Sequence, residues 1–144
     1  MGEFDLIARY FNRPASHIQQ GLHEVGSLDV VDIGIGDDCA VFTATKGTQL
    51  CISSDMLVEG RHFFADVNPE ALGHKALAVN LSDLAACGAT PRAFTLALAL
   101  PEVNEAWLEG FSRGLFALAD LHNCKLIGGD TTKGPLNICI TVFG

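Results

Sequence analysis

The chain has 144 residues, of which 49% are hydrophobic, so it has the size and composition of one ordinary folded domain with a sizeable core. Nine Lys and Arg residues against 17 Asp and Glu residues give a formal net charge of −8. This charge repels phosphate backbones and anionic lipid headgroups, so we expect neither nucleic acid nor a membrane as a partner.

The five cysteines predict a reducing environment. Their number is odd, none forms a Cys-x-x-Cys pair, and most lie within apolar runs, as buried free thiols do. The first residues are acidic where a secretory signal is basic, and Asp, Asn, Gly or Pro interrupts every long apolar stretch. We therefore expect a cytoplasmic protein without a membrane-spanning segment.

The first predicted element is a short amphipathic helix over residues 3–11. Phe4, Ile7, Ala8 and Phe11 recur there at helical spacing, and a polar stretch follows to about residue 27. We therefore expect an N-terminal helical arm over residues 1–28 and a main domain over residues 29–144.

A hairpin and a long helix are predicted next. Two β-rich runs, residues 39–44 and 49–53, flank Lys46-Gly47, which is typical of a β-hairpin. Asn68 followed by Pro69 predicts a helix start, because asparagine caps the first turn and proline fits its first position. The helix is expected to run to about residue 87 and to end at Gly88.

The second half of the chain alternates strands and helices. Residues 93–100 alternate bulky and small apolar side chains, which predicts a strand buried on both faces. Asn104 predicts the cap of a second helix. The apolar stripe of this helix consists of Leu108, Phe111, Leu115, Leu118 and His122. With further strands at residues 125–127 and 137–143, the pattern predicts an α/β (α+β) fold with helices packed on a mixed sheet. Because the last residues are strand-like, we expect the chain to be part of a longer protein.

Acidic motifs are the main functional signal. The sequence lacks both Gly-x-x-x-x-Gly-Lys-Ser/Thr and Gly-x-Gly-x-x-Gly, so neither common phosphate-binding loop is available. Four acidic motifs instead accompany the apolar segments: Gly34-Ile35-Gly36-Asp37-Asp38, Ser53-Ser54-Asp55, Asn80-Leu81-Ser82-Asp83 and Gly128-Gly129-Asp130-Thr131-Thr132. Carboxylates that converge repel each other unless divalent cations neutralise them, so the set predicts Mg²⁺ and phosphate binding.

Each motif alone also fits a structural role. Asp37-Asp38 fits a turn with a helix cap, Ser53-Ser54-Asp55 fits a strand end, and residues 128–131 fit a plain turn. Asp83 is harder to explain in this way, because it lies on an inward stripe near a helix C-terminus, where a negative charge is unfavourable. His62 lies on a predicted loop and fits either a contact to a substrate phosphate or packing.

Five stretches of the sequence stand out in this order: EFDLI (3–7), IGDDCA (35–40), SDMLVEGRHF (54–63), KALAVNLSDLAA (75–86) and LIGGDTT (126–132). Together they resemble the bacterial thiamine-monophosphate kinase family. The resemblance covers essentially the whole chain and corresponds to the family's N-terminal domain, within the aminoimidazole-ribonucleotide synthetase-like superfamily. It implies ATP-dependent phosphorylation of thiamine monophosphate to thiamine diphosphate by direct in-line transfer, with several Mg²⁺ ions.

The resemblance also implies roles for particular residues, with no catalytic nucleophile among them. The implied metal ligands are Asp38, Ser53, Ser54, Asp55, Asp83 and Asp130. Gly129 and Asp130 match the family's nucleotide-binding turn, and His62 matches its substrate-contacting histidine. Residues 29–144 would then form the metal- and ATP-binding domain, which dimerises with a second copy. Without the family's C-terminal domain, this piece alone is expected to be inactive.

Two other classes of function fit the same motifs. One is another ATP-using enzyme of the superfamily, such as a selenophosphate or aminoimidazole-ribonucleotide synthetase. Residues 1–28 contain no cysteine, whereas a selenophosphate synthetase needs a reactive Cys or selenocysteine there. The other is a non-catalytic metal-binding dimerisation module, which would bind no nucleotide.

Overall fold

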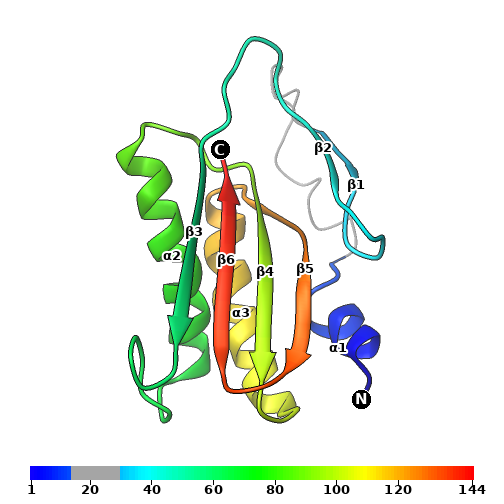
Figure 1. The fold of residues 1–144 in the computed structure, drawn as a ribbon, viewed down its shortest axis with the longest axis vertical. Helices are drawn as coiled ribbons and strands as arrows, with labels where there is room; N and C mark the ends of the chain where they lie inside the picture. The colour runs from blue at the N-terminus through cyan, green and yellow to red at the C-terminus, as the bar shows by residue number, and fades with distance from the viewer. Residues whose placement is uncertain (14–29) are drawn as a thin grey trace.

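A mixed four-stranded sheet covered by helices confirms the α/β class expected from the sequence. The computed structural model describes residues 1–13 and 30–144 (Figure 1), so the expected boundary at residues 28 and 29 falls outside the described residues. The elements in chain order are α1 (Glu3–Tyr10), β1 (Val30–Ile33), β2 (Val41–Thr43), β3 (Ile52–Val58), α2 (Pro69–Ala86), β4 (Ala93–Leu100), α3 (Glu105–Leu121), β5 (Lys125–Lys133) and β6 (Asn137–Phe143).

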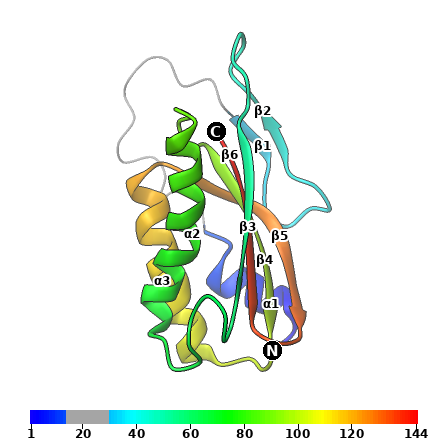
Figure 2. The ribbon, with the colours of Figure 1, turned by 60° about the vertical axis from the view of Figure 1, so that its left-hand side comes forward.

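The main sheet has the strand order β3-β6-β4-β5. β6 pairs antiparallel with β3 and with β4, whereas β4 and β5 are parallel because α3 connects them as a crossover. β1 and β2 form a separate antiparallel ribbon. Figure 2 shows α2 and α3 side by side on one face of the main sheet, and α1 contacts α3 and β5.

Both long helices begin where the sequence predicts. Asn68 Oδ1 accepts a hydrogen bond from the Ala71 N–H at 3.1 Å, and Asn104 Oδ1 accepts one from the Trp107 N–H at 3.0 Å. Gly88 follows the end of α2 with a φ of 69°, a left-handed conformation that glycine adopts without strain. Among the described helices, none is both long and apolar enough to cross a membrane.

β4 is covered on one face only. Phe94, Leu96, Leu98 and Leu100 point toward the helices, and each is at most 6% exposed. Ala97 points to the other face and is exposed. The expectation of a strand buried on both faces is therefore wrong for the single chain, because both long helices lie on the same side of the sheet.

The hairpin predicted over residues 39–53 is also wrong. Lys46-Gly47 does form a turn, in which the Thr48 N–H donates to the Thr45 carbonyl oxygen at 3.2 Å. β2 nevertheless pairs with β1, and β3 pairs with β6 from the other end of the chain. A turn sets the chain direction only locally. Burial of one side of β3 beneath the helices instead favours its pairing with β6.

β5 is longer than the strand predicted at residues 125–127 and continues through the glycine-rich motif. Gly128, Gly129 and Asp130 therefore lie within a strand and not in a turn. A Cβ atom on Gly129, whose φ is 147°, would lie 1.8 Å from the Leu96 carbonyl oxygen. This glycine is required because β4 and β5 approach closely. Glycine is typical both of turns and of such close approaches, so the sequence alone does not distinguish the two.

α1 confirms the predicted N-terminal helix, but its buried side differs. Leu6 and Phe11 are 2% and 5% exposed, whereas Phe4, part of the predicted stripe, is 82% exposed. The ion pair of Arg9 with Glu105, at 3.0 Å, helps to hold α1 against α3. The docking of α1, and not the periodicity of its sequence, decides which residues it buries.

Candidate functional site

The junction between β3 and α2 brings three of the predicted metal ligands together. Ser53 and Asp55 lie two residues apart on β3, and Asp83 lies in the last turn of α2. The Ser53 hydroxyl donates to Asp83 Oδ2 at 3.2 Å. Asp83 also lies near enough to Asp55 to raise the pKa of the Asp55 carboxyl group. Three hard oxygen donors therefore meet at one edge of the sheet.

Alternation along β3 selects the residues that join this group. Asp55 is paired with Ile140 of β6, which is 0% exposed beneath the helices, so Asp55 points toward the helix side. Ser53 has the same orientation. Ser54 points to the other face of the sheet, where its hydroxyl lies 3.0 Å from Thr141 Oγ1. The Ser53-Ser54-Asp55 run therefore divides between the two faces.

Two effects disfavour the charged form of Asp55. Partial burial raises its pKa above the ordinary value, and the negative charge and hydrogen bond of Asp83 raise the pKa further. His62 acts in the opposite direction and lowers the pKa of Asp55. Two carboxyl groups in mutual repulsion form a site that a divalent cation would stabilise.

His62 lies on the loop that follows β3. The Val58 N–H donates to His62 Nδ1 at 3.0 Å, and the His62 N–H donates to the Val58 carbonyl oxygen at 2.9 Å. The ring and the backbone are therefore both held against the end of β3. Because Nδ1 accepts a hydrogen bond, the neutral ring carries its proton on Nε2 and can offer that donor to a ligand.

Asp130 lies away from the Asp55 and Asp83 pair. In the register of β4 and β5, Asp130 is paired with Ala97, which is exposed on the face without helices. Two strands, β6 and β4, separate β5 from β3. The sheet thus places Gly129 and Asp130 two strands from Asp55, with the Asp130 carboxylate on the opposite face.

Asp38 precedes the β1–β2 ribbon's second strand and is exposed. Its backbone N–H donates to Asp37 Oδ1 at 2.9 Å, which stabilises the turn after Gly36. The ribbon lies on the β5 side of the main sheet, whereas α2 lies toward β3 (Figure 1, Figure 2). The described part of one chain therefore does not bring Asp38 to the β3 and α2 junction.

The donors at this junction suit Mg²⁺ in kind but do not complete its coordination. Ser53, Asp55 and Asp83 offer hydroxyl and carboxylate oxygens, the ligand type that Mg²⁺ prefers. Within residues 1–13 and 30–144, no group of three or more His, Cys, Asp and Glu side chains is placed to hold a metal ion. Since Mg²⁺ commonly keeps waters and substrate phosphates as ligands, a partial protein site is compatible with it.

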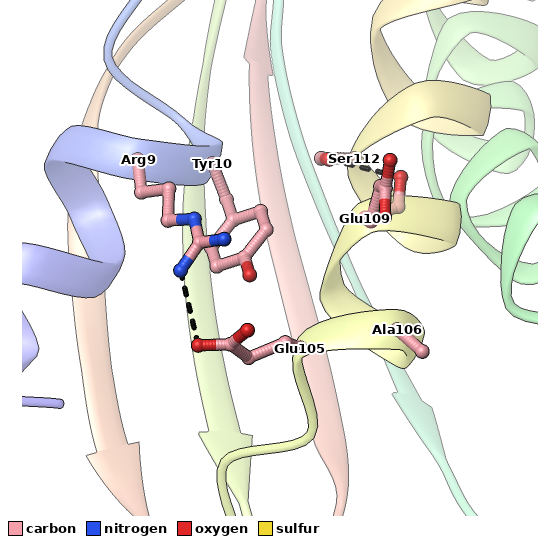
Figure 3. A pocket seen from close by; sticks show the side chains of 6 residues that line it. All are labelled: Arg9, Tyr10, Glu105, Ala106, Glu109 and Ser112. Atoms are coloured by element: carbon pink, nitrogen blue, oxygen red, sulfur yellow. Dashed lines mark hydrogen bonds and ion pairs between the residues drawn. The ribbon is translucent and has the colours of Figure 1, made fainter.

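A groove of about 580 Å³ lies elsewhere, between α1 and α3 (Figure 3). Arg9 points there toward Glu105, with which it forms an ion pair at 3.0 Å. The Ser112 hydroxyl donates to the Glu109 carbonyl oxygen at 3.2 Å. These contacts support helix packing and give no reason to place a ligand in this groove.

One further residue approaches the site, and the sequence patterns did not single it out. Lys75 of α2 donates from Nζ to the His62 carbonyl oxygen at 2.5 Å. Lys75 and Asp83 are separated by two i to i+4 steps, so both lie on one stripe of the helix. That spacing could have indicated from the sequence that Lys75 lies on the same side of the helix as Asp83.

Comparison with known protein families identifies the part of the chain that contains these site residues. Residues 36–144 match the family described as AIR synthase related protein, N-terminal domain. The chain belongs to this family. The matched range contains all of the predicted metal, nucleotide and substrate residues, and it confirms the fold that the sequence motifs implied.

Individual relatives confirm the resemblance to thiamine-monophosphate kinases. The thiamine-monophosphate kinase of Salmonella typhimurium is 54% identical over 143 residues, 99% of this chain and 41% of that protein. A crystal structure of the kinase from Stenotrophomonas maltophilia K279a has 51% identity and a TM-score of 0.75, covering 79% of this chain and 36% of that one. AaThiL complexed with AMPPCP and TMP has 34% identity and a TM-score of 0.64, covering 66% and 31%. The chain therefore spans about two fifths of the length of the curated relatives it matches.

Proposed function

We propose that this chain is the N-terminal part of a cytoplasmic thiamine-monophosphate kinase of thiamine diphosphate biosynthesis. The enzyme would transfer a phosphoryl group from ATP to thiamine monophosphate. The 54% identity to the Salmonella typhimurium kinase across 99% of the chain carries this proposal. The structural likeness to AaThiL, determined with AMPPCP and TMP, supports a nucleotide and a thiamine phosphate as the two substrates.

The acidic groups would serve the transfer by holding Mg²⁺. Ser53, Asp55 and Asp83 are the donors nearest to one another, and Asp38, Ser54 and Asp130 are the other predicted ligands. Bound Mg²⁺ supplies positive charge that neutralises phosphate oxygens. Phosphoryl transfer depends mainly on alignment and on such neutralisation, so no covalent enzyme intermediate is needed.

His62 and the β5 motif would bind the two substrates. His62 offers its Nε2–H beside the end of β3, where it would donate to the acceptor. Asp130 is exposed on the open face, and a Cβ atom at Gly128 would meet nothing within 4 Å, so the strand leaves room for a nucleotide beside Gly129 and Asp130. The loop that carries His62 follows β3, which is two strands away from β5, so parts of the protein beyond this sheet would have to join the two predicted substrate regions.

We also propose that two copies associate through the open face of the main sheet. Ile52 and Met56 of β3 are 62% and 54% exposed on this face, and Ala97 of β4 is exposed on the same face, with β6 between the two strands. Apolar side chains on a sheet face without covering helices favour association. A two-fold axis would cover the same strands in both copies.

The decisive test is turnover by the full-length protein. Incubation with ATP, Mg²⁺ and thiamine monophosphate should form thiamine diphosphate and ADP in equal amounts, and EDTA should stop the reaction. Unphosphorylated thiamine serves as the control acceptor and should give no diphosphate. A folded protein that forms no thiamine diphosphate would contradict the proposal. Calorimetry with MgATP distinguishes the proposed kinase from a non-catalytic dimerisation module, because such a module would bind no nucleotide.

A further inference from the structure

The loop after β3 is fixed at several points of its backbone. The Gly60 N–H donates to the Phe63 carbonyl oxygen at 2.8 Å, and Gly60 has a φ of 81°. Phe63 is only 7% exposed, so its side chain anchors the end of the loop in the core. The Arg61 N–H donates to the Val58 carbonyl oxygen at 3.1 Å. The loop therefore has a defined conformation, in which the exposed His62 lies between Arg61 and Phe63, both of which are held in place.

Lys75 ties this loop to α2. Its ammonium group donates to the His62 carbonyl oxygen at 2.5 Å, from a helix that packs against β3. A hydrogen bond from a charged donor is stronger than one between neutral groups. The carbonyl of His62 is held by Lys75, and the ring of His62 is held by the Val58 N–H at 3.0 Å.

The same helix also carries Asp83. α2 runs antiparallel to β3, so Asp83 meets Ser53 near the beginning of the strand while Lys75 meets the loop beyond its end (Figure 1). With a rise of 1.5 Å per residue, the two helix positions are about 12 Å apart along the axis. α2 therefore fixes the acidic pair and His62 relative to each other.

We infer that Lys75 is a positioning residue for the acceptor substrate: by holding the His62 carbonyl, it fixes the place from which the His62 Nε2–H would donate to that substrate. This inference rests on the proposed function for the identity of the acceptor. Lys75 acts through His62 and not by contact with the reacting atoms. Loss of its ammonium group would allow the loop to move away from α2 while the Asp55 and Asp83 pair remains.

Steady-state kinetics of the full-length protein test the inference. Lys75→Met keeps the aliphatic stem but removes the donor, so the KM for thiamine monophosphate should rise about tenfold, while kcat and the KM for ATP change less than about twofold. Lys75→Arg retains a charged donor and should restore most of the affinity. Lys46→Met, which removes a lysine from an exposed turn, is the matched control and should behave as wild type. Equal kinetics for Lys75→Met and Lys46→Met would overturn the inference, as would a fall in kcat that arginine does not rescue.

A double-mutant cycle separates an action through His62 from a separate role of Lys75. In a His62→Ala background, Lys75→Met should raise the KM for thiamine monophosphate by less than about twofold, because the group that Lys75 positions is already absent. A full additional effect in that background would show that Lys75 acts independently, and it would overturn the inference.

Histidine ring spectra give a readout that needs no turnover. Nitrogen-15 NMR of the wild type should show His62 as a single Nε2–H tautomer, with the signal assigned by its loss in His62→Gln. Lys75→Met should shift or broaden this signal, and Lys46→Met should leave it unchanged. An unchanged His62 signal in Lys75→Met would overturn the positioning role. If the wild type shows the fixed tautomer but does not phosphorylate thiamine monophosphate, the proposed function fails and the positioning role survives.

Discussion

The Ser53 hydroxyl donates to Asp83 Oδ2 at 3.2 Å and so joins β3 to the last turn of α2. Asp55 lies two residues farther along β3, and the negative charge of Asp83 raises its pKa. The acidic pair therefore exists only when α2 packs on β3. A change at Asp83 affects the pair without removing any side chain from the buried core, because Asp83 is exposed.

Asp83→Asn should abolish most of the turnover proposed for the full-length protein. The substitution removes a charged metal ligand but keeps the size of the side chain, so we expect kcat to fall about 100-fold or more with the fold intact. Steady-state assays and circular dichroism measure the two effects. Asp66→Asn makes the same chemical change in an exposed loop and should leave turnover normal. Near-normal turnover of Asp83→Asn at ordinary Mg²⁺ concentrations would contradict the metal-ligand role.

Mg²⁺ should stabilise the 144-residue chain relative to EDTA. An ion that binds only the folded site adds about 2.7 kcal/mol when its free concentration is 100 times its Kd. A thermal melt across an Mg²⁺ titration measures the shift in Tm. The shift should disappear in Asp83→Asn and persist in Asp66→Asn. A Tm that is independent of Mg²⁺ would mean that this chain alone has no preformed cation site.

Asp55 should make stability depend on pH when EDTA removes divalent cations. Its folded-state pKa is raised, so its stabilising contribution is full below the ordinary aspartate pKa and is lost as the pH rises through the folded-state pKa. Asp55→Asn removes the charge, and we expect this variant to be more stable than wild type at neutral pH. The difference should shrink as the pH falls toward the ordinary aspartate pKa. Urea unfolding at several pH values measures the difference in stability between Asp55→Asn and wild type. A difference that does not change with pH would contradict the raised pKa of Asp55.

Gly129→Ala should destabilise the fold strongly. The added Cβ would lie 1.8 Å from the Leu96 carbonyl oxygen, at a φ of 147° that L residues rarely adopt. Strain and overpacking together should cost about 2–5 kcal/mol of the free energy of unfolding. Gly128→Ala is the matched control, since its Cβ would meet nothing within 4 Å. Similar urea midpoints for the two variants would contradict the close approach of β4 and β5.

Met56→Lys should convert a dimer to a monomer if the open face is the interface. Met56 is 54% exposed on β3, and a lysine in an apolar interface would leave a buried charge without a partner. Light scattering at micromolar concentrations measures the mass. Leu121→Lys, at the 76% exposed end of α3, is the control and should stay dimeric. A wild type that is strictly monomeric would exclude this dimer.

The sequence by itself determined the elements with local signals. Asn68 and Asn104 cap the two long helices as predicted, because a cap depends only on the next few backbone N–H groups. The strands Ala93–Leu100 and Asn137–Phe143 also have the predicted bounds, since both are rich in apolar residues. The ordered motifs likewise identified the family, which the match over residues 36–144 confirms.

Only the tertiary structure decided which of these residues meet. Ser53, Ser54 and Asp55 are consecutive in an acidic motif, but strand alternation sends Ser54 to the open face and the other two toward α2. Which face of a strand is buried depends on where the helices pack, and the partner of β3 comes from the far end of the chain. The contact of Lys75 with His62 has the same origin, because a side chain on a helix and a carbonyl on a loop are joined by packing that no local pattern encodes.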